Sequence, residues 1–210
     1  MIDENRKLIF TIGHSNQSSQ TFLKLLADNL IQILVDVRSN PHSRFASQFD
    51  ITTLKKALAN TGIKYLYMGN ALGGKPSDPS MYDKEGHALY HLMAQSPPFL
   101  KAVQKLLKGS ESFRIALLCT EEDPSECHRY LLVGRVVEQN GVRILHIRAD
   151  GRVQTDEQLE KVNVQRPTAS SQLAMFSERR GVSWRSAKSI RSASRNGAQK
   201  NSSKPLRKLE

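Results

Sequence analysis

The sequence has few cysteines and no long hydrophobic run, and each shortage excludes a class of protein. Two cysteines among 210 residues are too few for a scaffold held together by disulfides. No run of about twenty apolar residues could span a bilayer, and no N-terminal stretch is flanked as in a signal peptide. We therefore expect a cytoplasmic protein with no membrane partner.

The charge of the chain is concentrated at one end. The net charge is +11, and residues 166–210 alone hold eleven Lys or Arg against two acids. The remaining chain is close to neutral, with 20 basic and 18 acidic residues, and hydrophobic residues make up 39% of the whole. The composition predicts one folded domain over residues 1–165 and a flexible, disordered basic tail over residues 166–210.

Five short apolar runs alternate with segments that have helical spacing. Ser18 is a helix-capping residue, Pro97 and Pro98 divide the helical stretch over residues 88–107, and a further helix is expected from about Ser125 to Gln139. This alternation predicts an α/β fold: an open, mostly parallel sheet of about five strands with helices on both faces. The expected strands are residues 7–12, 31–37, 63–68, 113–119 and 142–147.

Polar and glycine-rich segments follow the first four expected strands. The carboxyl ends of parallel strands meet at one edge of a sheet, and ligands bind at that edge in open α/β folds. The sequence therefore predicts a single catalytic or binding cleft at this edge. Its candidate residues are His14, Ser15, Asp36, Arg38, Arg44, Gly73, Gly74, Lys75, Cys119, Glu121, Cys127, His128 and Arg129.

An anion such as phosphate is the predicted ligand of the earlier segments. In the turn Gly13-His14-Ser15, backbone N–H groups and a hydroxyl can face an anion at a helix start, although a simple helix-capping turn is the alternative. Arg38 and Arg44 can clamp phosphate or carboxylate through two hydrogen bonds. The Gly73-Gly74-Lys75 segment adds close backbone approach and a mobile cation, or is only a flexible turn.

The carboxylates Asp36 and Glu121 are the candidates for proton transfer. Asp36 and Arg38 alternate along a strand end, so both should point to the same side. Asp36 then acts as a base or orients a histidine, or it pairs structurally with a neighbouring arginine. Glu121 follows a buried strand, where partial burial can raise its pKa and suit it to act as a general acid or base.

The two thiols allow several interpretations. The Asp123-Pro124 pair predicts a helix start, so Cys127, His128 and Arg129 should lie in its first turn, where a thiolate is stabilised. Cys127 is therefore a candidate nucleophile, whereas Cys119 shapes the binding site or is a small buried hydrophobe. A metal ion is possible but not favoured, because the spacing C-x7-C-H lacks a paired C-x2-C, and adjacent helical residues point in different directions. The sequence identifies no cofactor.

The motifs TIGHS, VDVRSNPHSRF, LGGK and LLCTEEDPSECHR, in this order, resemble the bacterial family catalogued as domain of unknown function four-eight-eight. The resemblance covers roughly residues 8–150. It implies a compact α/β domain, suspected to be enzymatic, in a family whose members are often labelled DNA-repair proteins. An Asp-Val-Arg at a strand end also occurs in rhodanese-like domains, but there the nucleophilic cysteine lies in a short anion-binding loop.

The tail contains a second candidate element. Residues 172–176, QLAMF, resemble the short peptide by which bacterial DNA-processing enzymes dock onto the replication sliding clamp. The apolar side chains would fill a pocket and the glutamine would fix the direction, unless the segment packs on its own domain. The basic stretch from Arg179 to Lys208 suits contact with DNA phosphates, with stacking of bases on Trp184. The predicted clamp-binding residues are Gln172, Leu173, Met175 and Phe176.

Together, these features predict a DNA-associated enzyme, a hydrolase or repair factor that acts on a nucleotide or a damaged nucleic-acid component. Asp36, Glu121, Cys127 and His128 are the predicted catalytic residues. A thiol-dependent, rhodanese-like sulfur-transfer enzyme is an alternative of a different class. A non-catalytic module that senses a nucleotide or binds DNA is the third. The predicted partners are DNA, the sliding clamp and a nucleotide-like small molecule.

Overall fold

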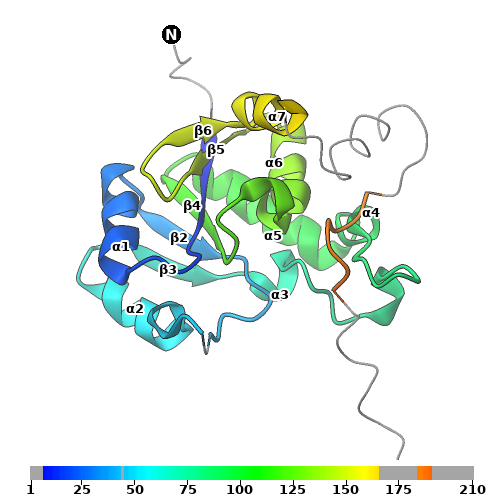
Figure 1. Cartoon of the computed structure of the whole chain (residues 1–210), viewed down its shortest axis with the longest axis horizontal. Helices are drawn as coiled ribbons and strands as arrows, with labels where there is room; N and C mark the ends of the chain where they lie inside the picture. Colours follow the sequence, from blue (N-terminus) through cyan, green and yellow to red (C-terminus); the bar gives the residue numbers. More distant parts are fainter. Residues whose placement is uncertain (1–6, 44, 166–183, 191–210) are drawn as a thin grey trace, which may run out of the picture.

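The computed structural model describes residues 7–43, 45–165 and 184–190 (Figure 1). The strands are β1 Leu8–Gly13, β2 Ile33–Asp36, β3 Lys64–Tyr67, β4 Ile115–Cys119, β5 Arg143–Ile147 and β6 Val153–Thr155. The α-helices are α1 Ser19–Asp28, α2 Ile51–Ala59, α3 Gly69–Leu72, α4 Tyr90–Met93, α5 Pro97–Ser110, α6 Arg135–Gln139 and α7 Asp156–Gln165. Short 3-10 turns cover Ser47–Phe49, Pro79–Met81 and Pro124–Glu126, and a π-helical segment covers Arg129–Gly134.

The strands of the described residues form one sheet in the order β3-β2-β4-β1-β5-β6. β1 to β5 run parallel, and β6 runs antiparallel to β5 at the edge. The central strand β4 is buried at every position, because helices cover both faces of a parallel sheet and leave no solvent side. The predicted mostly parallel α/β sheet is confirmed, and the carboxyl ends of its five parallel strands lie at one edge.

Helices cover both faces of the sheet (Figure 1), and each face has its own hydrophobic core. Helix α1 begins at Ser18, whose side chain accepts the N–H of Thr21, and its buried residues follow helical spacing. Helices α1 and α2 supply one core with Phe22, Leu25, Leu26, Leu54 and Leu58. Helices α5 and α6 and the π-helical segment supply the other with Phe99, Val103, Leu106, Leu132, Val133, Val136 and Val137.

The chain after β5 contains two elements that the sequence analysis did not predict, β6 and α7. Gly151, at φ +86°, allows the tight turn between β5 and β6. The strand then pairs Val153 with Ile147 and Thr155 with Leu145. A three-residue strand with the sequence Val-Gln-Thr has no apolar run, so a pattern-based prediction has nothing to detect.

Residues 184–190, which the composition assigned to the basic tail, pack onto the domain, and we call Trp184–Ile190 the C-terminal strap. The strap forms a β-bridge between Arg185 and Leu89, and the N–H of Ser186 donates to Ala88 O over 2.8 Å. The indole N–H of Trp184 donates to Leu131 O over 2.7 Å. The folded unit therefore includes this strap in addition to the residues before 166.

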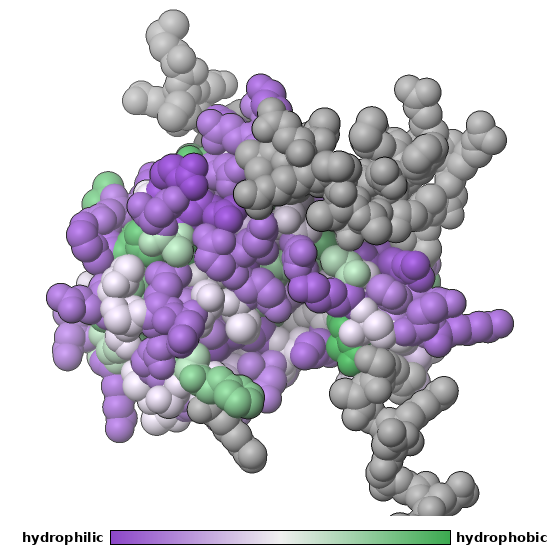
Figure 2. All heavy atoms as spheres, viewed as in Figure 1, coloured by the Kyte–Doolittle hydropathy of each residue, from purple (hydrophilic) through white to green (hydrophobic). Residues whose placement is uncertain are grey.

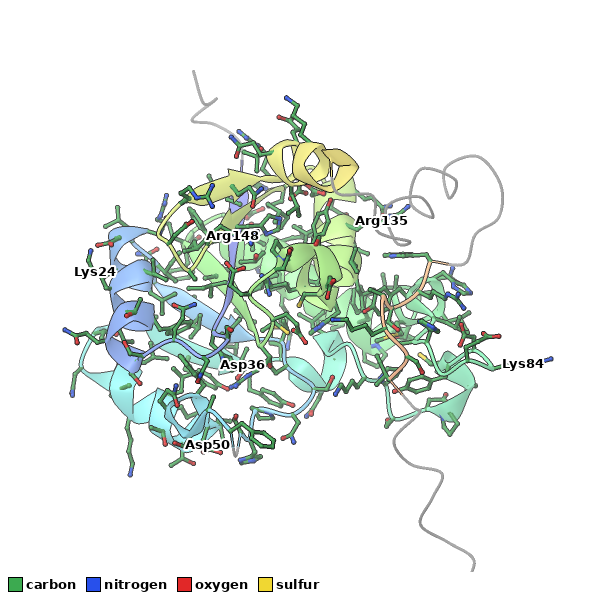
Figure 3. All side chains as sticks on the ribbon, viewed as in Figure 1. Lys24, Asp36, Asp50, Lys84, Arg135 and Arg148 are labelled. Carbon is green, nitrogen blue, oxygen red and sulfur yellow. The ribbon has the colours of Figure 1, made fainter. Side chains whose placement is uncertain are left out.

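The position of Trp184 corrects the expectation that its indole is free to stack on bases. The ring packs against the sheet's larger core, edge-on to Tyr90 with centroids 6.4 Å apart. The guanidinium of Arg135 lies 4.7 Å from the ring centroid, and Figure 3 shows Arg135 beside the strap. Both the polar group and the ring of the indole therefore have partners within the protein.

The surface in Figure 2 is mostly hydrophilic, with small separate apolar areas. The exposed large hydrophobic residues among those described are Leu30, Phe45, Leu66, Leu92, Leu100, Phe113 and Val153. Such scattered side chains are ordinary for a protein surface. In the part of the chain that the structure describes, every helix is too short or too polar to cross a bilayer.

Candidate functional site

The candidate site lies where two neighbouring central strands end. Strands β1 and β4 pair in parallel, with Gly13 beside Cys119. The helix after β1 packs in one core and the helical segments after β4 pack in the other. Where connections leave neighbouring strands toward opposite faces, a crevice opens at the carboxyl ends, and ligands bind there in α/β folds. The topology therefore points to residues 13–15 and 119–129.

The turn Gly13-His14-Ser15 is bonded to the neighbouring chain. The N–H groups of His14 and Ser15 donate to the carbonyl oxygens of the Cys119–Thr120 backbone over 3.0 and 2.8 Å. A Cβ atom on Gly13 would lie 1.7 Å from the carbonyl oxygen of Glu121, so only glycine permits this approach. The two N–H groups expected to face an anion are thus already bonded, and these residues can reach a ligand only through their side chains.

Asp36 and Arg38 form a buried ion pair at the end of β2, where Figure 3 labels Asp36. Arg38 Nη2 lies 2.6 Å from Asp36 Oδ2 and Nε lies 2.9 Å from Oδ1. The hydroxyl of Tyr65 also donates to Asp36 Oδ2 over 2.7 Å. Both carboxylate oxygens are therefore occupied, as expected for structural pairing rather than for a free base.

The remaining contacts of Arg38 join β2 to the turn after β1. Its Nη1 lies 3.2 Å from His14 Nε2 and donates to Phe49 O over 2.9 Å. Burial acts to lower the pKa of Arg38, but Asp36 outweighs it and raises that pKa. Burial is the main cause that lowers the pKa of His14, and the nearby charge of Arg38 also lowers it. Arg38 therefore stays charged, and His14 is held neutral.

The two cysteines and Glu121 converge on one point. Cys119 Sγ lies 2.9 Å from Glu121 Oε2, and Cys127 Sγ lies 3.2 Å from the same oxygen. The cysteines are 3% and 1% exposed, whereas Glu121 is exposed. Of these three residues, Glu121 is therefore the one that solvent reaches, whereas both thiols are buried.

His128 completes the cluster. Its Nδ1 lies 3.6 Å from Cys119 Sγ and 3.9 Å from Cys127 Sγ. Its Nε2 lies 2.9 Å from the carbonyl oxygen of Val37, which can only accept, so Nε2 carries a proton. The ligand atoms of Cys119, Cys127 and His128 lie within 4.8 Å of one another, a grouping that can hold a metal ion.

The backbone at Cys127 explains how the side chains of the adjacent residues Cys127 and His128 both lie in the same cluster. Cys127 has extended dihedrals, φ −113° and ψ 139°, and follows a 3-10 turn, so it precedes the helix rather than lying in its first turn. Its carbonyl oxygen accepts the N–H of Leu131, and its sulfur accepts the N–H of Arg129 over 3.4 Å. Because Cys127 is outside the helix, its side chain need not diverge from that of His128. This corrects the sequence-based argument against a metal site.

Arg129 lies wholly inside the protein and is 0% exposed. It donates through Nη1 to the carbonyl oxygen of Glu121, through Nη2 to that of Glu122 over 2.7 Å, and through Nε to the hydroxyl of Thr11 over 3.3 Å. These oxygens are uncharged, so the guanidinium keeps a positive field next to the thiols. Arg129 thus fixes the loop that carries Glu121 and does not face a substrate.

The pKa values of the groups in the cluster are shifted in different directions. Burial alone raises the pKa of a thiol, but the Cys119 hydrogen bond, Arg129 and His128 together lower the pKa of Cys127 to about 5. Burial and the bond to Cys127 raise the pKa of Cys119. Hydrogen bonds from the thiols outweigh burial and lower the pKa of Glu121. The pKa of His128 is raised because Cys127 outweighs its burial.

The Gly73-Gly74-Lys75 segment packs against the cluster. A Cβ atom on Gly74 would lie 2.7 Å from Cγ of His128, and one on Gly73 would lie 2.4 Å from Oγ of Ser39. The N–H of Lys75 donates to the same hydroxyl over 2.9 Å. The side chain of Lys75 is exposed, so it is a cation that a ligand above His128 could contact.

Most of the predicted residues do gather at one edge. Contacts from Arg38 to His14 and from His128 to Val37 join the ends of β1, β2 and β4. Sequence reasoning missed Thr11, Tyr65 and Ser39, which hold the predicted residues in place. The hydroxyl of Thr11 in an otherwise apolar run was the signal available for one of them. Outside the described residues lie Arg44, Gln172, Leu173, Met175 and Phe176.

The fold and the site define an α/β protein with a thiol, imidazole and carboxylate cluster where its two central strands end. The chain belongs to the family Domain of unknown function DUF488, whose model matches residues 18–136, more than half of the 210 residues. The resemblance seen in the motifs is thereby confirmed, and the match includes Asp36, Cys119 and Arg129. Neither the curated proteins nor the solved structures gave a match.

Proposed function

We propose that this protein is a hydrolase that acts on a nucleotide or a damaged nucleic-acid component, with Glu121 as its proton-transfer group. The observation that carries the proposal is the carboxylate of the exposed residue Glu121, which lies 2.9 and 3.2 Å from the sulfurs of two buried thiols. Its lowered pKa keeps it ionised and able to accept a proton from water. Cys127 and His128 would position this carboxylate, and Asp36 would hold Arg38 in the wall of the site.

The substrate class is inferred from charge. Lys75 is exposed beside the cluster and is the better candidate for a phosphate contact, because Arg38 is committed to Asp36. The eleven basic residues of 166–210 would attract DNA through its phosphates. The QLAMF peptide of residues 172–176 would dock the enzyme onto the sliding clamp. In this proposal the tail brings the enzyme to DNA, and Glu121 transfers the proton in the reaction.

One observation favours sulfur transfer as a second candidate. The lowered pKa of Cys127 makes it a thiolate near neutral pH, which is the nucleophilic form of cysteine. Cys127 is only 1% exposed, however, so a substrate reaches its sulfur only after Glu121 has moved aside. A thiosulfate sulfur-transfer assay of wild type and Cys127→Ser separates the two functions, since only sulfur transfer uses that sulfur as the nucleophile.

The test is a ligand screen followed by a turnover assay on the full chain. Nucleotides, damaged oligonucleotides and ADP-ribose-like compounds are screened for thermal stabilisation, and each hit is assayed for hydrolysis. Glu121→Gln should lower turnover by about 10²–10⁴-fold while the thermal shift persists. Glu126→Gln is the matched control, because this exposed acid of the same segment pairs with Lys188.

The outcome also decides between an enzyme and a sensor. If every stabilising compound is left intact by the wild type, the protein is a nucleotide-sensing or DNA-binding module and the hydrolase proposal is wrong. If Glu121→Gln and Glu126→Gln lose turnover equally, the carboxylate at 121 has no special part in catalysis.

A further inference from the structure

Four groups that donate electron pairs converge at the end of β4. Two sulfurs, from Cys119 and Cys127, and one imidazole nitrogen, from His128, lie within 4.8 Å of one another. A carboxylate oxygen of Glu121 lies 2.9 and 3.2 Å from the two sulfurs. Protonated thiols donate to this carboxylate, but ionised thiols repel it and each other unless a cation lies between them. A positive ion bound by the ionised thiols would remove that repulsion.

We propose that Cys119, Cys127 and His128 bind one zinc-class divalent metal ion, leaving a fourth position that opens toward Glu121. The inference deepens the proposed hydrolase, and it depends on that function only for the use made of the open position. A bound metal ion of this class polarises a water molecule. Glu121 would accept the proton of that water.

The nitrogen-to-sulfur spacing of the ligands fits a tetrahedral ion. Bonds of about 2.3 Å to sulfur and about 2.0–2.1 Å to nitrogen place those atoms about 3.5–3.6 Å apart. The Nδ1 atom of His128 lies 3.6 and 3.9 Å from the two sulfurs, so the ligands need to move by only a few tenths of an ångström. Glu121 Oε2 lies 2.9 and 3.2 Å from the sulfurs, closer than a fourth ligand would lie, so we assign Glu121 to proton transfer and not to the ion.

The chemistry of the ligands selects the metal. Thiolate and imidazole ligands favour zinc, whereas magnesium and calcium require oxygen ligands. A set of two cysteines and one histidine provides three protein ligands, the number at which zinc keeps an open, catalytic position. The burial of Cys119 and Cys127, which is unfavourable for a nucleophile, is suitable for ligands of a buried ion.

Surrounding groups hold the ligands in place, as outer-shell partners do in metal sites. The Nε2–H of His128 donates to Val37 O over 2.9 Å, which leaves Nδ1 as the coordinating nitrogen. The N–H of Arg129 donates to Cys127 Sγ over 3.4 Å. Gly74 packs against the ring of His128, where a side chain would collide with it.

The experiment uses the full chain, purified, stripped with a chelator and titrated with Zn²⁺ or Co²⁺. We expect one ion per chain, and for Co²⁺ the thiolate charge-transfer band and the intense visible bands of four-coordinate cobalt. Cys119→Ser, Cys127→Ser and His128→Ala should each weaken binding by at least tenfold. His42→Ala is the matched control, since this exposed histidine contacts Asp50, away from the cluster, and should bind as tightly as the wild type.

A second measurement needs no substitution in the site. Zn²⁺ should slow alkylation of both cysteines of the wild type at least tenfold, and chelation should restore the rate. This readout remains valid if a cysteine variant fails to fold. Binding of less than one ion per chain, equal binding by His128→Ala and His42→Ala, or alkylation rates unaffected by Zn²⁺ would each overturn the metal site.

The two proposals fail in distinguishable ways. Stoichiometric zinc in a protein that hydrolyses none of the stabilising compounds would refute the hydrolase and leave the metal site intact. Suppose instead that chelator-stripped protein has full turnover and does not bind Zn²⁺ when titrated with it. That result would refute the metal site and leave the hydrolase.

Discussion

Asp36 and Arg38 hold each other inside the protein, at 0% and 3% side-chain exposure, through contacts of 2.6 Å between Oδ2 and Nη2 and 2.9 Å between Oδ1 and Nε. Removing one charge leaves the other buried and unpaired. We therefore expect Asp36→Asn to lower the free energy of unfolding by about 3–5 kcal/mol, measured by urea denaturation.

The matched control for this pair is Asp28→Asn. Asp28 forms an exposed pair with Lys24 one helical turn away, and such pairs contribute about 0.3–0.5 kcal/mol. An Asp36→Asn protein as stable as Asp28→Asn would contradict the structural role. In that case Arg38 would be free for the anion-binding role that the sequence suggested.

Trp184 is the single tryptophan of the chain, so its fluorescence reports on the strap alone. The indole N–H donates to Leu131 O, and Arg135 covers the ring, so bases cannot stack on it while the strap is docked. Saturating single-stranded oligonucleotide should therefore leave the emission maximum and intensity unchanged, even where a mobility shift shows binding by the basic residues. Strong quenching at the same concentrations would show that the indole leaves its site.

Removing the indole should weaken the attachment of the strap. Trp184→Ala should lower the free energy of unfolding by about 2 kcal/mol or more, because it deletes both packing and a hydrogen bond. Trp184→Phe keeps an aromatic ring and should lose less. Circular dichroism of the thermal transition measures both, and an unchanged Trp184→Ala transition would mean that the strap contributes no stability.

His146 should make the protein acid-sensitive. It is fully buried, and burial, followed by the charges of Arg129 and Arg148, lowers its pKa from 6.5 to about 3, outweighing the opposing charges of Glu138 and Cys127. Between these values the unfolded chain binds a proton that the folded chain does not. Stability from this residue is thus complete above pH 6.5 and is lost as the pH falls toward 3, at up to about 1.4 kcal/mol per pH unit.

The measurement is urea unfolding of wild type and His146→Gln between pH 7 and pH 4, a range that begins above the unfolded pKa of 6.5 and stays above the folded pKa of about 3. The difference between the two proteins should shrink as the pH falls, because only the wild type carries this proton linkage. His42→Gln, at an exposed histidine, should run parallel to the wild type. Parallel curves for His146→Gln would place the pKa of His146 near its ordinary value.

Gly74→Ala tests the packing of the glycine loop against the cluster. The added methyl group would lie 2.7 Å from His128 Cγ, and that ring is held by Val37 and cannot easily yield. We expect a loss of about 1–3 kcal/mol in the free energy of unfolding, together with weaker Co²⁺ binding. At Gly109 the nearest atom is the end of the flexible Ile115 side chain, at 3.0 Å, so Gly109→Ala should cost less and bind Co²⁺ normally. Equal effects of the two substitutions on Co²⁺ binding would contradict this contact.

The elements that sequence predicted are those with a strong local signal. The five apolar runs became β1 to β5, Ser18 became the cap of α1, and the proline pair became the start of α5. The gathering of residues at one edge followed from the parallel sheet. These features depend on periodicity and capping, which neighbouring residues determine together.

The features that the sequence analysis did not predict depend on contacts that the local sequence does not encode. The meeting of Cys127 with His128 rests on one extended residue before a helix, and a difference of a single position in the helix start changes it. The structural role of Asp36 depends on Tyr65, which is 29 residues away. The strap contacts a segment 99 residues earlier, as in the His87–Ser186 hydrogen bond, within a stretch whose composition resembles a tail.

The docked strap changes how the protein should be shortened for experiments. Ending the chain at Gln165, where the composition changes, would delete the indole that caps Leu131 O and uncover the backbone of residues 86–91. Ending it at Ile190 removes six Lys or Arg and one acid while keeping every strap contact described above. Trimming at that point would remove much of the proposed nucleic-acid attraction without a loss of folding, whereas a cut at the compositional boundary would remove both.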